Sequence, residues 1–168
     1  HTALEGGAKV ACVQNIGTAQ TTGNMGASVD TTKTDEAGIQ ACVGFLMEKN
    51  AYRSNRKLLE AWARNSYEAV TWWAETAAAG GVESKPYDSD REYNGYAYSL
   101  HANTYNHVEG AHNAAALVIC DALAAKGAEF FFNSPAVQLH KEGERVDGVV
   151  CETENGFVLF KGAKGVIL

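Results

Sequence analysis

The sequence predicts a mixed α/β fold that ends in an α+β arrangement. Three observations predict it: an apolar run preceded by glycines near the start, two helical segments with capping residues, and a late switch to alternating apolar and polar residues. The chain has 168 residues, of which 46% are apolar and 20% are charged, as is ordinary for a globular protein. A chain of this length can bury about 70% of its unfolded surface, and it corresponds to one domain at most.

The first half of the chain is predicted to contain a strand, a long loop and two helices. Residues 8–14 (AKVACVQ) are typical of a buried parallel strand, and residues 1–7 resemble the last turn of a helix with a glycine stop. Residues 17–34 are polar and punctuated by glycines, which indicates a long functional loop. Residues 35–50 carry an apolar stripe with acidic residues in the first turn, and a longer stripe follows Ser54 or Asn55 as the cap and runs to about residue 79, so both segments are predicted helices.

The second half is predicted to change from helix to antiparallel strands. Residues 82–106 contain several tyrosines but little pattern, and we expect irregular surface there. Residues 110–126 form a predicted helix whose inner side carries small residues. The segments that follow alternate apolar and polar residues and lie too close together for crossover helices, which predicts a three-stranded antiparallel meander between two further short strands. These predicted strands are residues 129–132, 136–141, 145–153, 157–161 and 165–168.

Charge and hydropathy argue against nucleic-acid binding and against a membrane-spanning helix. The net charge is −6 and the basic residues form no cluster, so we expect no nucleic-acid partner. No apolar run approaches the length of about 18 residues that a membrane-spanning helix needs, so no membrane span is predicted.

The cysteines and histidines do not form a metal-binding pattern. The cysteines at positions 12, 42, 120 and 151 include no CxxC pair and match no zinc spacing, so we expect free thiols, most of them buried. His101, His107 and His112 lie near Glu109 without the H-E-x-x-H spacing, and polar surface histidines are the preferred interpretation. No metal site is predicted.

Three stretches carry a resemblance to a known family. They are GAKVACVQN at residues 7–15, TTGNMGAS at residues 21–28, and residues 117–168, where a helix ending in AKG leads into AEFFFNSPAVQL and the turn KEGERVDGVV. In this order they resemble the FAD-binding domain of the fumarate reductase/succinate dehydrogenase flavoprotein family, in particular flavocytochrome c fumarate reductases. The resemblance implies a partial Rossmann-like FAD-binding domain over residues 1–168, with the three-stranded meander and several helices.

The resemblance also implies that this is a fragment truncated at both ends. The family's GxGxxG phosphate loop is absent from these residues, and we expect it upstream of position 1. The final KGVIL resembles the lead into the family's Ala-Thr-Gly-Gly segment, which is expected downstream.

The resemblance assigns FAD-binding roles to eight residues. Gln14 closes an apolar strand where a dinucleotide places its ribose, and its amide can accept and donate hydrogen bonds there. Val137 would turn its backbone toward adenine. The glycine-containing loop offers small residues that let backbone N–H groups approach an anion. Its predicted contacts are Thr22, Gly23 and Asn24 with the pyrophosphate, and Gly26, Ala27 and Ser28 with the isoalloxazine ring.

The implied function is the FAD-binding part of a flavoprotein oxidoreductase. The flavin would exchange a hydride with a C=C or C–C bond of a small-molecule substrate, which residues outside this chain would select. No catalytic residue is assigned here, because the family's proton-donating arginine is expected downstream, and the electron donor stays open. The alternatives are a non-enzymatic α+β binding or interaction domain, and another flavin class, whose dithiol branch is disfavoured by the lack of a redox CxxC.

Overall fold

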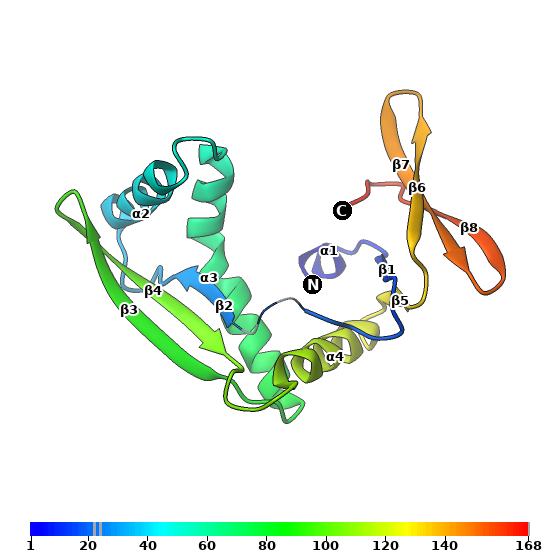
Figure 1. The fold of residues 1–168 in the computed structure, drawn as a ribbon, viewed down its shortest axis with the longest axis horizontal. Helices are drawn as coiled ribbons and strands as arrows, with labels where there is room; N and C mark the ends of the chain where they lie inside the picture. The colour runs from blue at the N-terminus through cyan, green and yellow to red at the C-terminus, as the bar shows by residue number, and fades with distance from the viewer. Residues whose placement is uncertain (22, 24, 168) are drawn as a thin grey trace. The chain divides into compact units, whose positions relative to one another are not determined.

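The chain folds into two compact units. The computed structural model describes residues 1–21, 23 and 25–167. Unit 1 consists of residues 1–20 and 119–168, and unit 2 consists of residues 21–118. Figure 1 labels the helices and strands of both units. The boundary falls inside α4 (Ala111–Ala124), whose first residues belong to unit 2 and whose last residues belong to unit 1.

Unit 2 is built on an antiparallel sheet of three strands in the order β2-β4-β3. These strands are β2 (Met25–Val29), β3 (Lys85–Tyr93) and β4 (Tyr96–Thr104). The expectation of irregular surface at residues 82–106 is therefore wrong, as is that of a loop without strands before residue 34. Asn94 and Gly95 connect β3 to β4 with φ angles of 53° and 81°. An Asn-Gly pair with positive φ at both positions is a strong hairpin signal, and it accounts for the tight connection between these two strands.

Two capped helices cover this sheet; the sequence predicts the helices but not the sheet that they cover. Asp35 caps α2 (Glu36–Lys49) by accepting a hydrogen bond from the Gly38 N–H at 2.8 Å. Asn55 caps α3 (Arg56–Ala79) by accepting one from the Lys57 N–H at 3.0 Å. Each cap satisfies a backbone donor that the first turn of a helix would otherwise leave unpaired.

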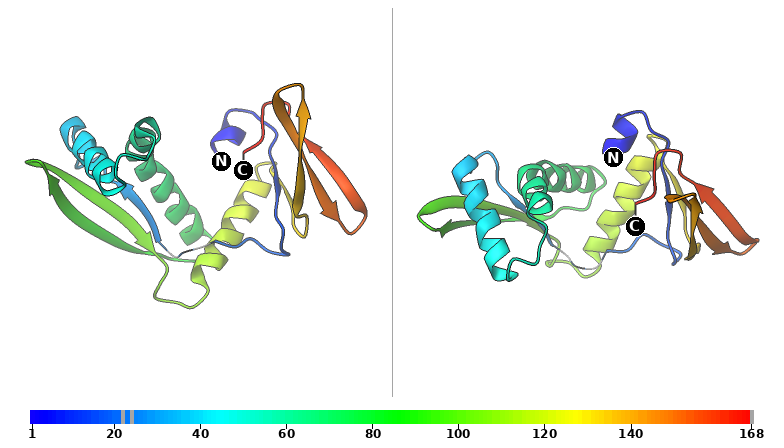
Figure 2. Two further views of the ribbon diagram at one scale, coloured as in Figure 1. Left: turned by 45° about the horizontal axis from the view of Figure 1, so that its top comes forward. Right: turned by 90° about the horizontal axis from the view of Figure 1, so that it is seen from above.

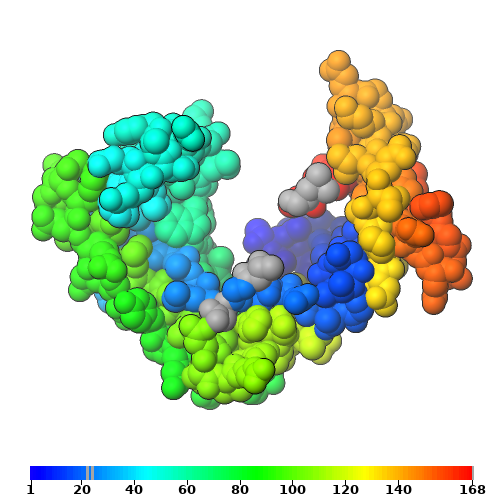
Figure 3. Space-filling view, in the orientation of Figure 1, coloured from blue at the N-terminus to red at the C-terminus, as the bar shows by residue number. Residues whose placement is uncertain are grey.

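The main core of unit 2 lies between these helices and the sheet. In Figure 1 and in both views of Figure 2, α2 and α3 lie on the same side of the β3–β4 hairpin. The space-filling view shows α2 and the hairpin as one contiguous body (Figure 3). The core holds the buried residues Val29, Ile39, Ala41, Cys42, Val43, Met47, Ala63 and Tyr98. Burying each large apolar side chain of this kind contributes about 1.5–3 kcal/mol to folding.

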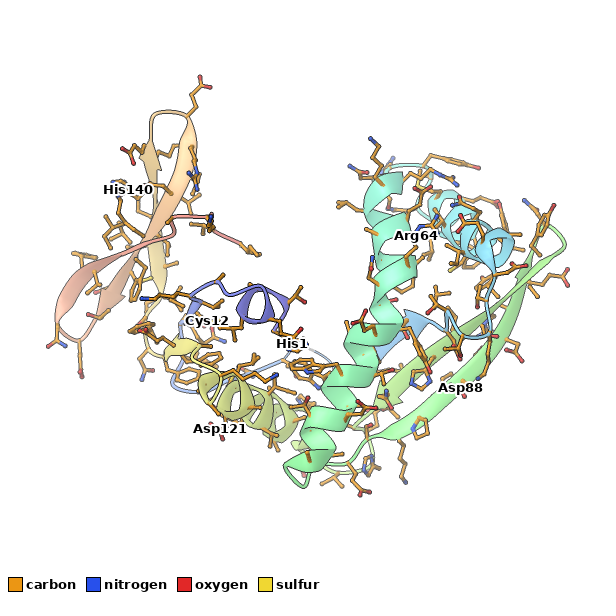
Figure 4. All side chains as sticks on the ribbon, turned by 180° about the vertical axis from the view of Figure 1, so that it is seen from behind. His1, Cys12, Arg64, Asp88, Asp121 and His140 are labelled. Atoms are coloured by element: carbon orange, nitrogen blue, oxygen red, sulfur yellow. The ribbon has the colours of Figure 1, made fainter. Side chains whose placement is uncertain are left out.

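An ion pair also joins the two helices. Arg64 of α3 points toward α2 (Figure 4) and donates from Nη1 and Nη2 to the two carboxylate oxygens of Glu36, at 2.5 and 2.7 Å. Gln40 donates a further hydrogen bond to Glu36. The Arg64 guanidinium and the Gln40 amide lower the pKa of Glu36 to about 2. The pair therefore stays ionised over the whole neutral and mildly acidic range.

Unit 1 begins with a parallel strand pair. After α1 (Thr2–Glu5), β1 (Ala11–Val13) pairs in parallel with β5 (Glu129–Phe131), as expected for the first apolar run. Burial differs from the expectation, because Ala11 and Cys12 are exposed. All four cysteines are free; Cys42 and Cys151 are buried.

The predicted antiparallel meander is confirmed. It consists of β6 (Ala136–Glu142), β7 (Arg145–Thr153) and β8 (Gly156–Lys161), in that order. The register aligns Leu139, Val149 and Phe160 across the three strands. The Phe160 ring contacts Phe131 of β5, with ring centroids 4.7 Å apart, so the meander packs on the parallel pair. Residues 165–167 form no strand, contrary to the expectation, and Leu168 lies outside the described residues.

Among the described residues, no helix combines the length and the apolar character that crossing a membrane requires.

The close approach of α2 to β4 predicts a large effect of one glycine substitution. A Cβ added to Gly38 would lie 2.3 Å from the backbone carbonyl oxygen of Ala97 and 2.8 Å from Thr34. We expect Gly38→Ala to lower the free energy of unfolding by about 1–3 kcal/mol, because the helix must move away from the strand. Gly44→Ala in the same helix is the matched control, since its Cβ would meet only the Tyr93 ring at 3.3 Å. Urea denaturation of both variants tests this, and equal losses of stability would contradict it.

The carboxylate of Asp147 predicts a pH dependence for the meander. It accepts a hydrogen bond from His140 Nδ1 at 2.6 Å and lies 3.2 Å from Lys161 Nζ (Figure 4 labels His140). The His140 hydrogen bond, more than the Lys161 contacts, lowers the pKa of Asp147 below its ordinary 3.8. A lowered pKa stabilises the folded state above pH 3.8, and this contribution is lost as the pH falls through the folded-state pKa.

Asp147→Asn should therefore be less stable than the natural chain near neutral pH, and the difference should shrink below about pH 4. Thermal melting at several pH values measures this. Glu144→Gln, an exposed position in the adjacent turn, is the control. A difference that is the same at every pH would contradict the assignment.

Candidate functional site

Unit 2 contains a cavity of about 350 Å³ at one end of its sheet. This volume lies within the range of small-molecule sites. The walls come from the loop before β2, from β2 itself, from α3, from the end of β4 and from the start of α4. The lining residues are Thr21, Gly23, Met25, Gly26, Ala69, Val70, Trp73, Asn103, Tyr105 and His112. Most of this lining is apolar or aromatic, with a few polar groups among it.

The β2–β4 ladder gives the cavity its space. Gly26 pairs directly with Asn103, so a side chain at position 26 would lie beside the Asn103 amide. A Cβ at Gly26 would come within 3.4 Å of Val70 on α3, which is ordinary contact. The missing side chain therefore leaves open a gap between the sheet and α3, and a single methyl group would fit there without displacing backbone.

The loop before β2 is anchored to the start of α4. The Thr21 N–H donates a hydrogen bond of 3.1 Å to Asn113 Oδ1. Gly23 has a φ of 108°, a conformation that residues with a Cβ rarely adopt, and nothing lies within 4 Å of a Cβ built there. The backbone at Gly23 is thus open to a close approach from the cavity side.

A chain of hydrogen bonds orients the Asn103 amide. Ser84 Oγ donates to Asn103 Oδ1 at 3.1 Å, and Asn103 Nδ2 donates to His101 Nε2 at 3.1 Å. His101 Nδ1 in turn donates to Asp88 Oδ1 at 2.6 Å. The His101 hydrogen bond lowers the pKa of Asp88, with a smaller contribution from Lys33. An ionised Asp88 favours the His101 tautomer with its proton on Nδ1, which leaves Nε2 free to accept from Asn103.

Tyr105 places a buried hydroxyl in the same region. The residue is 4% exposed and packs with Ala77, Ala111 and Ala115 in a second small core. Its Oη makes no hydrogen bond of normal geometry among the described residues. Burial raises the pKa of Tyr105, while the nearby Ser84 hydroxyl and Trp73 indole partly offset that rise. The phenol is therefore neutral near neutral pH.

Two of the loop residues predicted to bind FAD line this cavity, namely Gly23 and Gly26. Ala27 is exposed next to them, whereas Ser28 is fully buried and its hydroxyl donates to the His101 carbonyl oxygen at 2.9 Å. The Ser28 side chain is thus committed to the sheet. Thr22 and Asn24 lie outside the described residues. The cofactor roles of all these residues stay predictions.

The two predicted adenosine contacts lie near each other in unit 1. The Gln14 N–H donates to the Phe131 carbonyl oxygen, and the Gln14 carbonyl oxygen accepts from the Ser134 N–H at 2.8 Å. The end of β1 therefore lies beside the segment that leads into β6, three residues before Val137. Val137 is 50% exposed and Gln14 is half-buried. Gln14 Oε1 already accepts a hydrogen bond from the Asn15 N–H at 2.9 Å, so its amide nitrogen is the freer end.

Sequence reasoning missed most of the cavity wall. Asn103 and Tyr105 lie in the stretch expected to be irregular, and only the Asn-Gly hairpin signal could have placed them on and after a strand. Trp73 of α3 packs against the second core and also lines the cavity. Within the part of the chain that the structure describes, no group of three or more His, Cys, Asp or Glu side chains could hold a metal ion.

Comparison with known proteins identifies the family. The family model for the FAD binding domain matches residues 1–168. None of the curated proteins compared with the chain matches it. Among solved structures, the open conformation of a flavocytochrome c3 fumarate reductase has a TM-score of 0.68 and 16% identity, over 98% of this chain and 29% of that chain. An L-amino acid deaminase from Proteus myxofaciens in complex with anthranilate has 12% identity over 93% of this chain and 39% of that one, but its TM-score of 0.36 is too low to support an argument.

The likeness to the fumarate reductase confirms the predicted fold class. The matched region covers under a third of that protein's length. At 16% identity the match is evidence for the fold alone. The family model is the stronger evidence for the family, because it matches the whole chain. It also confirms FAD as the expected cofactor. The protein therefore belongs to the FAD binding domain family.

Proposed function

We propose that this chain forms part of the FAD site of an oxidoreductase that resembles fumarate reductase. In this proposal the complete protein exchanges a hydride between the flavin and a C=C or C–C bond of a small-molecule substrate. The observation that carries it is the family match over residues 1–168 together with the cavity that Gly23 and Gly26 line. These two glycines belong to the loop that the resemblance assigns to the cofactor.

The residues of the cavity fit a flat conjugated ring. Met25, Val70 and Trp73 offer apolar and aromatic surface to a planar group, and the polar side chains of Asn103 and His112 lie among them. We therefore assign the isoalloxazine end of FAD to this cavity.

Unit 1 contains the residues that are proposed to contact ribose and adenine. Gln14 has an amide nitrogen that can donate to a ribose hydroxyl, whereas its oxygen is occupied by the Asn15 N–H. Val137 has an exposed side chain at the start of β6, and its backbone is the proposed adenine contact. Gln14 carries no charge, so its hydrogen bond to ribose lacks the added strength of a carboxylate.

FAD and the residues of this chain have different roles in the proposed reaction. FAD supplies the hydride-transfer chemistry when it is bound. The chain's own residues contribute position and exclusion of water: Gly23 permits close backbone approach, and Trp73 and Met25 shield one wall of the cavity. We assign no acid catalyst to these residues, and the substrate and electron donor are left to the complete protein.

Filling the gap at Gly26 should weaken flavin binding without unfolding the sheet. We expect Gly26→Val in the natural gene product to reduce FAD affinity at least tenfold, because the side chain would occupy the space between β2 and α3. Valine is favoured in strands, so circular dichroism should remain that of the natural protein. FAD fluorescence quenching measures the affinity. Ala27→Val, at an exposed neighbouring position, is the control, and equal effects of the two would argue against the cavity as the flavin site.

The 168 residues on their own should bind FAD poorly. The sequence contains no G-x-G-x-x-G, so the backbone turn that grips the pyrophosphate in dinucleotide-binding folds is missing from them. We expect no sub-micromolar binding when this chain is titrated with FAD and followed by flavin absorbance. Binding that tight would show that the described cavity and Gln14 suffice without such a turn.

A further inference from the structure

We infer that His101, Asn103 and Ser84 form a proton-operated switch in unit 2, in which uptake of a proton by the His101 ring reverses the side-chain amide of Asn103. This inference goes beyond the proposed function, because it needs no cofactor and concerns contacts within unit 2 alone. Its basis is a chain of hydrogen bonds that can be satisfied in two arrangements of the same atoms.

The His101 ring is held in place from two sides. Its Nδ1 donates to Asp88 Oδ1 of β3 at 2.6 Å (Figure 4 labels Asp88). The Tyr67 ring of α3 packs against it, with ring centroids 5.4 Å apart and an angle of 69° between the planes. The hydrogen bond from His101, together with the charge of Lys33, lowers the pKa of Asp88, so this carboxylate remains an acceptor near neutral pH. The ring therefore keeps its orientation when it gains a proton, and Nε2 is the nitrogen that changes.

The charged groups near the ring lie on its Nδ1 side. Lys33 Nζ is 3.7 Å from Asp88 Oδ2 and 3.1 Å from Asp30 Oδ2, so the two carboxylates share one cation. From α3 the titratable group that faces the ring is Tyr67. From β2 the cross-strand neighbour is Ser28, which is uncharged and bonds to the backbone carbonyl of the histidine. Among the described residues, none of these groups makes a hydrogen bond with Nε2.

The neutral ring and the amide satisfy each other. Nε2 of His101 accepts from Asn103 Nδ2 at 3.1 Å, and Asn103 Oδ1 accepts from the Ser84 hydroxyl at 3.1 Å. A proton on Nε2 turns this nitrogen into a donor, so that it would face the N–H group of the amide, donor against donor. The His101 side chain is 15% exposed and Asn103 is 8% exposed. The conflict must therefore be relieved by the protein's own groups and not by bulk water.

A half-turn of the amide removes this conflict. The Asn103 oxygen then accepts from Nε2 of His101, and its nitrogen donates to Ser84 Oγ, because a hydroxyl can both donate and accept. The oxygen and the nitrogen of an amide are nearly the same size, so the exchange needs no movement of the strands. Because a buried polar group without a partner is costly, the amide follows the protonation state of the ring.

The switch connects an exposed carboxylate to the cavity of unit 2. Asp88 has a side chain that is 54% exposed, and it is bonded to His101, which is bonded to Asn103. Asn103 lines the cavity. Reversal of its amide exchanges the places of an N–H donor and a carbonyl acceptor there, so the pH of the solvent determines the polarity of this part of the cavity wall.

The test follows both side chains by NMR in the natural gene product, with isotope-labelled histidine and asparagine, from about pH 8 to about pH 5, where histidine ordinarily titrates. At the upper end we expect a scalar coupling between His101 Nε2 and Asn103 Nδ2, which an N–H···N hydrogen bond transmits. At the lower end we expect this coupling to be lost and a proton to appear on Nε2, both with one midpoint. His140 is the internal control, because its Nδ1 bonds to Asp147 at 2.6 Å in the same way, and no described asparagine contacts its ring.

Three results would overturn the inference. They are a coupling that is missing at about pH 8, a coupling that persists after His101 has gained its proton, and an Nε2 that stays unprotonated down to about pH 5 in the folded protein. None of these results depends on FAD, so each would leave the proposed function standing.

One variant assigns the effect to the amide. In Asn103→Asp a carboxylate presents oxygen to Nε2 at every pH, so His101 should hold its second proton to a higher pH than in the natural protein. Asn106→Asp is the matched control, because it adds the same charge at an exposed position nearby, and it should leave the His101 titration nearly unchanged. Equal shifts in the two variants would indicate a general effect of charge and would contradict the direct contact. Circular dichroism checks that both variants fold, and the titration of the natural protein decides the question if Asn103→Asp does not.

Discussion

The antiparallel pairing of β2 with β4 is the constraint from which the candidate site follows. It joins two segments that are far apart in the sequence, from Met25 opposite Thr104 to Val29 opposite Leu100. This register places a glycine directly opposite Asn103. A shift by one residue would turn every side chain of β2 to the other face and would close the gap beside the amide. The cavity thus depends on a register more than on any single lining residue.

Buried polar groups hold that register. Ser66 of α3 accepts a hydrogen bond from the Val29 N–H at 3.3 Å, which attaches the edge strand to the helix. The Ser99 N–H of β4 donates to the Thr34 hydroxyl at 3.0 Å just after β2. Burial alone would raise the pKa of Asp30, but hydrogen bonds from Thr32 and Lys33 outweigh it and lower that pKa. Because unpaired buried polar groups are costly, such contacts define one arrangement of the strands and disfavour its alternatives.

The two units divide the predicted cofactor contacts between them. Unit 2 carries the glycine loop and the cavity, whereas unit 1 brings Gln14 and the start of β6 together through backbone hydrogen bonds around Ser134. A dinucleotide cofactor has two chemically different ends, and FAD-binding proteins need a separate contact for each. The chain belongs to the FAD binding domain family, and the roles of these residues toward FAD stay predictions.

The sequence by itself determined the elements whose signals are local. The apolar stripes predicted both helices, with Asn55 as one of two candidate caps, and the alternation after Pro135 predicted the meander, because helix periodicity and tight turns need only neighbouring residues. In unit 2 the Asn94-Gly95 pair marks the β3–β4 hairpin locally, whereas only the tertiary structure decided that β2 pairs with β4. β3 is mostly exposed and charged, so it lacks an apolar alternation, and β2 is a strand only because β4 pairs with it. Asn103 and Tyr105 became neighbours of Gly26 through that pairing, which no local pattern encodes.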